Sequence, residues 1–376
     1  MIIKETIKVF IPYGILLLWK YFTINILNVF RNKFKYFQVK ENTVLIVECH
    51  DNHGETLPGY IKYFLDLEYN VDVFISMFKK TGDTKRRNDL GLFNCFLNND
   101  KVKIMPLSAI DMNLFFRSKV ITNYSHVLIN TFNNEMERNH LFKVDLFKLK
   151  PICVVNTPDI YHEYFNTDKV ISLVKMDRIN KKPFHVVNSH YFGEFSKKNK
   201  SQVTTFFVLN TNELFRRNIY LLFDACKNLY SMGISNFSVK IIGKGINIPE
   251  YDFNNFQVYG SLDFQSMYNE IYNSDFILAL IDQASVQYTN KASGTYQLSY
   301  GFLKPILLHK KFSEVSGFTN ENSILYNDND KLAQAMERCI KMTDNDYSSL
   351  VSELEISQKK LYINSLNNLK KTLETL

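Results

Sequence analysis

A short polar segment in the second half of the chain has residue types that bind anions. It contains Lys291, Ser293, Gly294 and Thr295, between an apolar run and a predicted helix. The start of a helix leaves backbone N–H groups without partners and carries a partial positive charge. This turn could therefore hold a diphosphate, with Lys291 adding charge. Serine is also a common helix cap, so Ser293 could do no more than that. Both interpretations stay open.

Two further segments of the same half are expected at the ends of buried strands. Arg216 and Arg217 follow the strand predicted over 204–209. Their side chains could bind phosphate oxygens and offset the negative charge that develops on a leaving phosphate. An arginine pair at a helix start is also often a solvated surface feature. Gly243 and Lys244 follow another strand, where a glycine lets the backbone approach a ligand closely.

Candidate acid–base groups lie in the first half of the chain. Histidine is the side chain that titrates nearest neutral pH, so His53, on the loop after the first predicted strand, is our candidate general base. Glu55 or Asp51 could orient its ring. Asp159 follows a later strand and is a second candidate. The alternatives are an exposed loop histidine and, at Pro158 and Asp159, the start of a helix.

Two acidic triplets resemble a metal-binding pair of carboxylates. They lie at 328–330 and 344–346, and each has the spacing Asp-x-Asp. Both precede amphipathic helices, so helix capping is the simpler explanation. His50 and His53 have no third ligand at the spacing of a zinc site. We therefore predict no essential metal ion and no other cofactor.

The spacing of apolar residues predicts the elements that position these groups. Short apolar runs alternate with amphipathic stretches, which is typical of βαβ units and parallel sheets. Strands are expected over 43–49, 71–76, 102–105, 126–130, 151–156, 170–174, 184–188, 204–209, 238–242, 257–259, 276–281, 305–309 and 323–326. Helices are expected over 57–67, 218–232, 265–272 and 293–301, and two more close the chain. The candidate residues follow strands, so we expect them at the carboxyl ends of two sheets, where doubly wound folds bind ligands.

Length and composition set the broad class. The chain has 376 residues, 45% hydrophobic and 22% charged, which is globular composition with length for two domains. The formal net charge of +7 suits an anionic partner such as nucleic acid, anionic lipid or a nucleotide diphosphate. The basic residues are spread out and form no nucleic-acid-binding motif, so we expect no nucleic-acid partner. The five cysteines are far apart, unlike a disulfide framework, and we expect them to be reduced and buried.

The first forty residues differ from the rest of the chain. Residues 9–30 form an apolar run that contains Trp19 and Lys20 and is followed by Arg31 and Lys33. The run is long enough to span a bilayer, but its polar residues would be costly in hydrocarbon. A helix lying in the membrane interface fits better, with lysines at anionic phosphates. A membrane-spanning anchor and a helix packed on the protein's own body are the alternatives.

The order of features over about 204–342 resembles the donor-binding domain of GT-B glycosyltransferases, particularly glycosyltransferase family 4, a large retaining group. The matching pieces are Arg217-Asn218, Phe223-Asp224-Ala225, Ile241-Ile242-Gly243-Lys244-Gly245, Val258-Tyr259-Gly260, Tyr272-Asn273-Ser274-Asp275 and Tyr300-Gly301-Phe302-Leu303-Lys304-Pro305-Ile306. One feature of the family is absent: the two glutamates seven residues apart that usually surround the last helix. Gln297, Leu298 and Ser299 stand where the second glutamate would be expected.

The resemblance implies an α/β protein of the GT-B fold, with two Rossmann-like domains facing across a cleft and an N-terminal apolar and basic helix. It implies that Arg217, with Arg216 beside it, binds donor phosphates and that the 293–295 turn holds the diphosphate. The expected segments are a membrane-associating stretch (1–40), an acceptor domain (41–195), a linker (196–202), a nucleotide-sugar-binding domain (203–345) and a closing helix (346–376).

The implied activity is transfer of a hexosyl or related group from a nucleotide-sugar donor to a lipid-linked or other saccharide acceptor, with retention. The resemblance suggests bacterial surface polysaccharide synthesis, such as lipopolysaccharide or capsule. We expect a cytoplasmic protein, peripheral to the inner face of the cell membrane and in contact with its anionic surface. Two other classes stay open: a non-catalytic nucleotide-sugar-binding protein, and a nucleotide-sugar epimerase of the same architecture.

Overall fold

A computed structural model describes most of the chain. The described residues are 34, 37–48, 53–76, 90–116, 118–130, 150–155, 169–175, 184–209, 217–243, 255–285, 287–289 and 291–375. Asp159, Arg216 and Lys244 lie outside these ranges, as does the leader up to residue 33, so what was predicted for them stays a prediction. Within these ranges, no helix combines the length and the apolar character needed to cross a bilayer.

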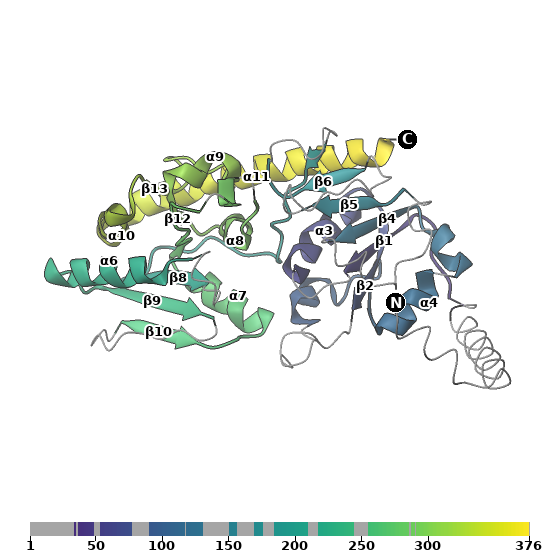
Figure 1. Cartoon of the computed structure of the whole chain (residues 1–376), viewed down its shortest axis with the longest axis horizontal. Coiled ribbons are helices and arrows are strands. Elements are labelled where there is room, and N and C mark those ends of the chain that lie inside the picture. The colour runs from purple at the N-terminus through teal and green to yellow at the C-terminus, as the bar shows by residue number, and fades with distance from the viewer. Residues whose placement is uncertain are drawn as a thin grey trace, which may run out of the picture.

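Seven parallel strands form the first sheet, in the order β3-β2-β1-β4-β5-β6-β7 (Figure 1). Their bounds are Thr43–Glu48 (β1), Asn70–Ser76 (β2), Val102–Leu107 (β3), His126–Asn130 (β4), Ile152–Val155 (β5), Val170–Ser172 (β6) and His185–Val186 (β7). The other elements of this half are η2 (Gly54–Thr56), α3 (Leu57–Asp66), η3 (Leu90–Phe96), α4 (Ala109–Phe116) and η4 (Lys119–Asn123).

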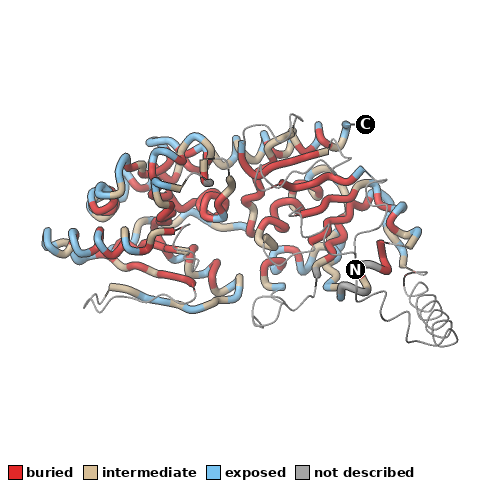
Figure 2. Tube along the Cα trace, viewed as in Figure 1, coloured by how far each residue is buried: buried red, intermediate tan, exposed pale blue. Residues whose placement is uncertain are grey.

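Both faces of this sheet are covered, which explains why its central strand β1 is apolar from Val44 to Val47. Ile46 of β1 belongs to the core that contains α3, whereas Leu45 and Val47 belong to the core that contains Phe115 of α4. Successive side chains of a strand point to opposite faces, so a strand covered on both sides needs apolar residues at every position. Figure 2 shows the central strands of this sheet as buried along most of their length.

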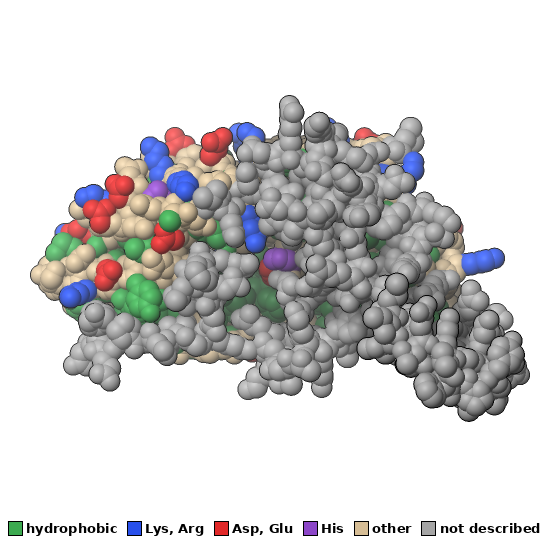
Figure 3. All heavy atoms as spheres, viewed as in Figure 1, with side chains coloured by type: hydrophobic (Ala, Val, Ile, Leu, Met, Phe, Trp, Pro, Cys, Tyr) green, Lys and Arg blue, Asp and Glu red, His purple; other side chains and the backbone are tan. Residues whose placement is uncertain are grey.

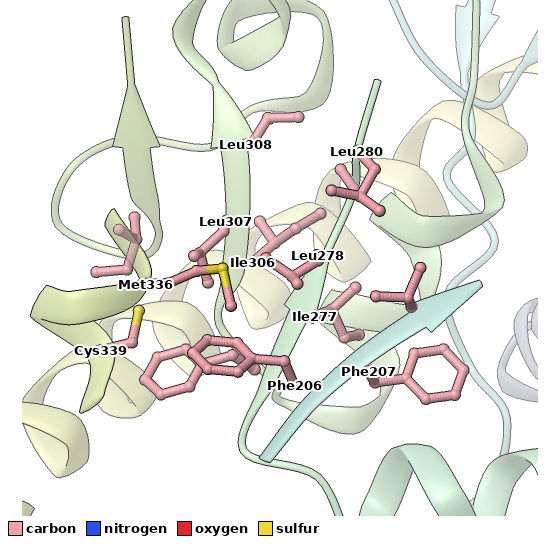
Figure 4. Close-up of a cluster of buried hydrophobic side chains, with 14 of the residues drawn as sticks. Phe206, Phe207, Ile277, Leu278, Leu280, Ile306, Leu307, Leu308, Met336 and Cys339 are labelled. Carbon is pink, nitrogen blue, oxygen red and sulfur yellow. The ribbon is translucent and has the colours of Figure 1, made fainter. Parts of the chain in front are cut away.

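Six parallel strands form the second sheet, in the order β10-β9-β8-β11-β12-β13. Their bounds are Thr204–Leu209 (β8), Phe237–Ile242 (β9), Phe256–Tyr259 (β10), Phe276–Leu278 (β11), Ile306–His309 (β12) and Ile324–Tyr326 (β13). The helices are α6 (Ile219–Ser231), α7 (Phe264–Tyr272), η8 (Gln287–Thr289), α8 (Gly294–Phe302), η9 (Lys310–Phe312), α9 (Ser313–Ser316), η10 (Asn329–Lys331) and α10 (Leu332–Lys341). Phe206 of β8 lies in one core with Met336 and Cys339 of α10 (Figure 4).

The two sheets share a topology that places their ligand-binding edges. In each, the chain begins at a central strand, adds two neighbours on one side and then switches to the other side. The switch lies between β1 and β4 in the first sheet and between β8 and β11 in the second. Open α/β sheets bind ligands outside the carboxyl ends of their strands at such a switch point. The segments after β1, β8 and β11 are therefore the places to look for a site.

The last helix, α11 (Asp344–Glu374), crosses from the second half of the molecule back to the first (Figure 1). Near its start, Tyr347 donates a hydrogen bond to the carbonyl of Asp275 in the second half, at 3.0 Å. Near its end, Ser365 accepts from the backbone N–H of Asn188 at 3.0 Å, and Leu369 is fully buried in the core of the first half. One continuous helix therefore joins the two halves.

Two glycines allow helices from both halves to approach the segment that connects them. A Cβ on Gly59 of α3 would lie 2.1 Å from Ser189 Oγ, and a Cβ on Gly301 of α8 would lie 2.4 Å from the carbonyl oxygen of His190. Neither distance is compatible with a side chain. The connector between β7 and β8 (residues 187–203) is consequently held between the two halves at Ser189 and His190.

We expect His190 of the connector to make the stability of the fold depend on pH. The buried Nδ1 lies 3.2 Å from Asn188 O and 3.1 Å from Asn188 Oδ1, so it must carry the proton. Burial lowers the pKa of His190 to about 4, against 6.5 for an ordinary histidine. The unfolded chain therefore binds the proton more tightly than the folded one, and stability is lost as the pH falls from about 6.5 toward about 4.

Because of His190, we expect the free energy of unfolding to be about 2 kcal/mol lower at about pH 5 than at about pH 7.5. His190→Gln does not titrate in this range and keeps an amide donor for Asn188. Urea unfolding of both proteins at the two pH values measures the effect. An equal loss of stability in wild type and His190→Gln would show that another group is responsible.

Most predicted strands agree with the structure to within a few residues, but one helix was missed and several expectations need correction. Helix α4 was not predicted, because its sequence lacks a clear helical apolar period. Cys95 is exposed on η3 rather than buried, whereas Cys153, Cys226 and Cys339 are buried as predicted. The side chain of Asp328 makes no capping bond to η10.

The cap of α11 is also not an aspartate of the second acidic triplet. It is Thr343, whose Oγ1 accepts from the N–H of Asp346 at 3.2 Å. Asp344 and Asp346 instead lie in the first turn of α11, where negative charge is favourable next to the helix dipole.

Candidate functional site

The start of α8 has the features of an anion-binding turn. Ser293 is at the N-cap position, yet its side chain makes no capping hydrogen bond; its Oγ lies 2.7 Å from Thr295 Oγ1 instead. The interpretation in which the Ser293 side chain caps the helix is therefore wrong. No acidic residue lies in the first turn, and Gly294 is exposed. The first N–H groups of α8 thus receive neither a side-chain cap nor a carboxylate from their own turn.

Arg217, just before α6, is the cation behind this turn. Its side chain is buried, with 5% of the residue exposed. Nη1 donates to the carbonyl oxygen of Ala279 at 2.8 Å, and Nη2 donates to Thr295 Oγ1 at 2.8 Å and Ser293 Oγ at 3.3 Å. These three acceptors are uncharged. They join two segments that were predicted separately, Arg217 and the 293–295 turn, into one structure with a guanidinium behind the turn.

The loop after β11 forms hydrogen bonds with Arg217 and with Asn218 next to it. Leu280, two residues after this strand, has a φ of 48°, in the left-handed region that costs energy for a residue with a Cβ. Its carbonyl accepts a hydrogen bond from the N–H of Asn218 at 3.0 Å. Asp282 accepts from Asn218 Nδ2 at 2.9 Å and from the N–H of Ala284 at 2.8 Å, and these bonds lower the pKa of Asp282. The backbone beside Arg217 is consequently held in an unusual conformation.

The other predicted residues of the second half occupy two further positions. Gly243 is buried at the end of β9, where its N–H donates to the carbonyl of Tyr259 at 3.2 Å. Lys291 is half-buried two residues before Ser293. The structure does not describe Arg216 or Lys244, so their roles stay predictions.

Several buried polar atoms near these strand ends lack hydrogen-bond partners, and sequence patterns did not reveal them. Within the described ranges they include Tyr296 Oη and Gln297 Nε2 in the first turn of α8 and His309 Nε2 at the end of β12. Burial raises the pKa of Tyr296 and lowers that of His309, so both side chains stay neutral. Unpaired buried polar atoms are rare and costly, so they mark this end of the sheet as incompletely satisfied.

The first half of the chain brings acid–base groups to the same place. His53 and Glu55 follow β1, with 36% and 28% of their side chains exposed and 3.4 Å between His53 Nδ1 and Glu55 Oε1. Glu55 Oε1 also lies 4.0 Å from the position that a Cβ on Gly294 would occupy. The loop of the first sheet therefore faces the start of α8 in the second. A histidine is exposed beside acidic and basic side chains between the two halves (Figure 3).

These groups do not make a metal site. Across the part of the chain that the structure describes, no three side chains of His, Cys, Asp or Glu converge closely enough to hold a metal ion. Asp159, the second candidate base, lies outside that part. What the geometry offers is a cationic helix start on one side and a histidine–carboxylate pair on the other.

Solved glycosyltransferases share this architecture over nearly the whole chain. TarM aligns with a TM-score of 0.58 at 8% identity, covering 90% of this chain and 99% of that chain. A trehalose-6-phosphate structure from E. coli, bound with UDP-2-fluoro glucose, aligns with a TM-score of 0.53 at 9% identity, covering 89% and 99%. UGT89C1 of Arabidopsis thaliana, complexed with quercetin, aligns with a TM-score of 0.52 at 11% identity, covering 89% and 99%.

The chain has the GT-B fold. This confirms the predicted fold class, while membership of family 4 within the GT-B fold stays a prediction. No protein-family model matches the sequence, and no curated protein matches it. At identities this low the likeness concerns the fold, so the activity has to be argued from the site itself.

Proposed function

We propose that this GT-B protein is a glycosyltransferase that moves a sugar from a nucleotide-sugar donor to a hydroxyl group of an acceptor. The observation that carries the proposal is Arg217, buried and hydrogen-bonded to the uncapped start of α8, where Gly294 lies close to Glu55 of the first half. The shared fold with glycosyltransferases supports it, as does the UDP-2-fluoro glucose bound in the E. coli structure.

The donor diphosphate would bind at the 293–295 turn. Backbone N–H groups at the start of α8 have no side-chain cap, and the helix dipole and Arg217 add positive charge. When the bond between the sugar C1 and the phosphate oxygen breaks, the nucleoside diphosphate keeps the electron pair. The growing negative charge is then stabilised by groups that are already in place. Lys291 adds a second positive charge to the same turn.

The acceptor hydroxyl would approach from the side of the first sheet. Its oxygen forms the new bond to C1, and its proton passes to His53, whose ring Glu55 orients. Resemblance to family 4 implies retention of configuration instead, with the leaving phosphate accepting that proton on the same face. Replacement of His53 separates these two routes, as argued below.

We also propose that the reaction needs no metal ion or other cofactor, because Arg217 and the α8 dipole supply the positive charge that a divalent cation would otherwise provide. The acceptor we propose is a lipid-linked saccharide of bacterial surface polysaccharide synthesis, met at the inner face of the membrane. Its support is the apolar and basic sequence of residues 1–40.

A panel of nucleotide sugars tested by thermal shift, with and without EDTA, checks the proposal. At a hundredfold excess over Kd, a ligand that binds only the folded state adds about 2.7 kcal/mol of stability. We expect one nucleotide family to raise Tm by several degrees, equally in the presence of EDTA. Addition of saccharide acceptors should then release nucleoside diphosphate.

Three outcomes would count against this function. If no nucleotide sugar shifted Tm, the proposed donor-binding site would be contradicted. Conversion of free donor to another sugar without acceptor would indicate an epimerase. Tight binding without product under all acceptors would indicate a binding protein.

A further inference from the structure

A buried cluster of polar side chains lies next to the backbone of His53. We define it as Glu48, Thr56 and Asn130, which are 1%, 4% and 1% exposed. Glu48 and Asn130 are the last residues of neighbouring strands β1 and β4 and pair with each other in register. Both strands are otherwise largely apolar, so polar side chains at these two ends are not needed for the sheet itself. Their cost of burial has to be offset by hydrogen bonds.

These bonds converge on the backbone carbonyl of His53. It accepts from Thr56 Oγ1 at 2.8 Å, from the Thr56 N–H at 3.1 Å and from Asn130 Nδ2 at 3.1 Å. Asn130 Nδ2 also donates to Glu48 Oε2, and Thr56 Oγ1 lies 3.0 Å from Asn130 Oδ1. Glu48 Oε2 accepts from Asn130 Nδ2, so the Nδ2 end of the amide faces Glu48 and the Oδ1 end faces Thr56.

We propose that Thr56 and Asn130 are positioning residues for His53, oriented in turn by Glu48. The inference rests on the function proposed above, in which His53 takes the acceptor proton. With its carbonyl held by both side chains, the His53 backbone has little freedom, and its ring stays beside Glu55 and the start of α8. A general base has to lie within hydrogen-bond reach of the proton that it takes. Small displacements of such a group reduce turnover strongly.

The same cluster ties His53 to the connector between the two halves. The carbonyl of Thr56 accepts a hydrogen bond from Ser189 Oγ, and Gly59 leaves room for Ser189 to lie against α3. The position of His53 is thus fixed relative to the connector, which leads into the second half.

Thr56→Val is the most informative substitution. Valine keeps the shape of threonine and removes only the hydroxyl. Thr56 is also at the N-cap position of α3 without a side-chain capping bond, so α3 loses no cap. We expect kcat to fall about tenfold while KM for the donor stays within about twofold. Thr56→Ser keeps the hydroxyl, so this variant should have a kcat close to that of wild type.

Thr204→Val is the matched control. Thr204 is 1% exposed in β8, and its hydroxyl has no hydrogen-bond partner among the described residues. This control makes the same chemical change in a buried strand position away from His53, and kcat should stay unchanged. If Thr56→Val lowered kcat no more than Thr204→Val, or raised KM alone, the positioning role would be overturned.

A double-mutant cycle tests whether Thr56 acts through His53. In a His53→Ala background, Thr56→Val should have no further effect on kcat, because the group that it positions is gone. Additive losses would overturn the proposal.

A readout without substrate separates this inference from the proposed function. The His53 ring should give one sharp NMR signal in wild type and Thr56→Ser, and a broadened or split signal in Thr56→Val. An unchanged signal in Thr56→Val would overturn the positioning role even if the protein proved to be a transferase. If the signal changed in Thr56→Val but the protein bound no donor, the positioning of His53 would be supported and the proposed function would be contradicted.

Discussion

Arg217→Ala is expected to lower the affinity for the nucleotide-sugar donor by at least about a hundredfold, which corresponds to about 2.7 kcal/mol. The guanidinium supplies the buried positive charge behind the 293–295 turn, and it also fixes both hydroxyls of that turn through Nη2. Its loss removes a charge-assisted contact to phosphate and loosens the turn that presents the backbone N–H groups. The thermal shift produced by the donor should nearly disappear.

Two comparisons make this result specific. Arg217→Lys keeps the charge but cannot reproduce the planar fork that reaches Ala279, Ser293 and Thr295, so we expect only partial recovery. Arg338→Ala removes an exposed arginine of the same half, whose Nη2 donates to the carbonyl of Leu325, and should leave donor binding unchanged. Circular dichroism should be used to check that each variant is folded. Donor binding by Arg217→Ala equal to that of wild type would exclude Arg217 from the site.

His53→Ala is expected to lower kcat by about a hundredfold to ten-thousandfold, the usual contribution of a general base. Donor binding should change little, because His53 belongs to the opposite half of the molecule from Arg217. The loss should therefore appear in kcat and in kcat/KM to the same extent, as expected for an interaction made only in the transition state. Steady-state kinetics with the donor found by thermal shift measures both constants.

His126→Gln serves as the control for this prediction. His126 is at the first position of β4, the end of the strand opposite to Asn130, and its ring lies beside Tyr69. Its replacement should leave kcat unchanged. A fall of less than about tenfold in His53→Ala would favour the retaining route, in which the leaving phosphate accepts the proton. The anomeric configuration of the product then decides between the two routes.

The chemistry of the site could be predicted only in part from the sequence. Arg217 and the 293–295 turn were identifiable because arginine, small hydroxylated residues and glycine follow predicted strands. Their direct hydrogen bonds were not predictable, since 76 residues separate Arg217 from Ser293 along the chain. Asn130 was missed because one asparagine after an apolar run resembles any strand end. Only the pairing of β4 with β1 places it next to Glu48.

The sequence by itself determined the fold class and the order of its strands. Alternating apolar runs and amphipathic stretches specify βαβ units, and helices that cover both faces of a sheet require the continuous apolar strands seen at β1. Such patterns are local, so they can be recognised along the chain. Tertiary structure alone decided which polar groups meet: Arg217 with Ser293 and Thr295, Glu55 with Gly294, and Asn130 with His53. These contacts depend on strand order and on the connector held by Gly59 and Gly301, and neither leaves a periodic signal in sequence.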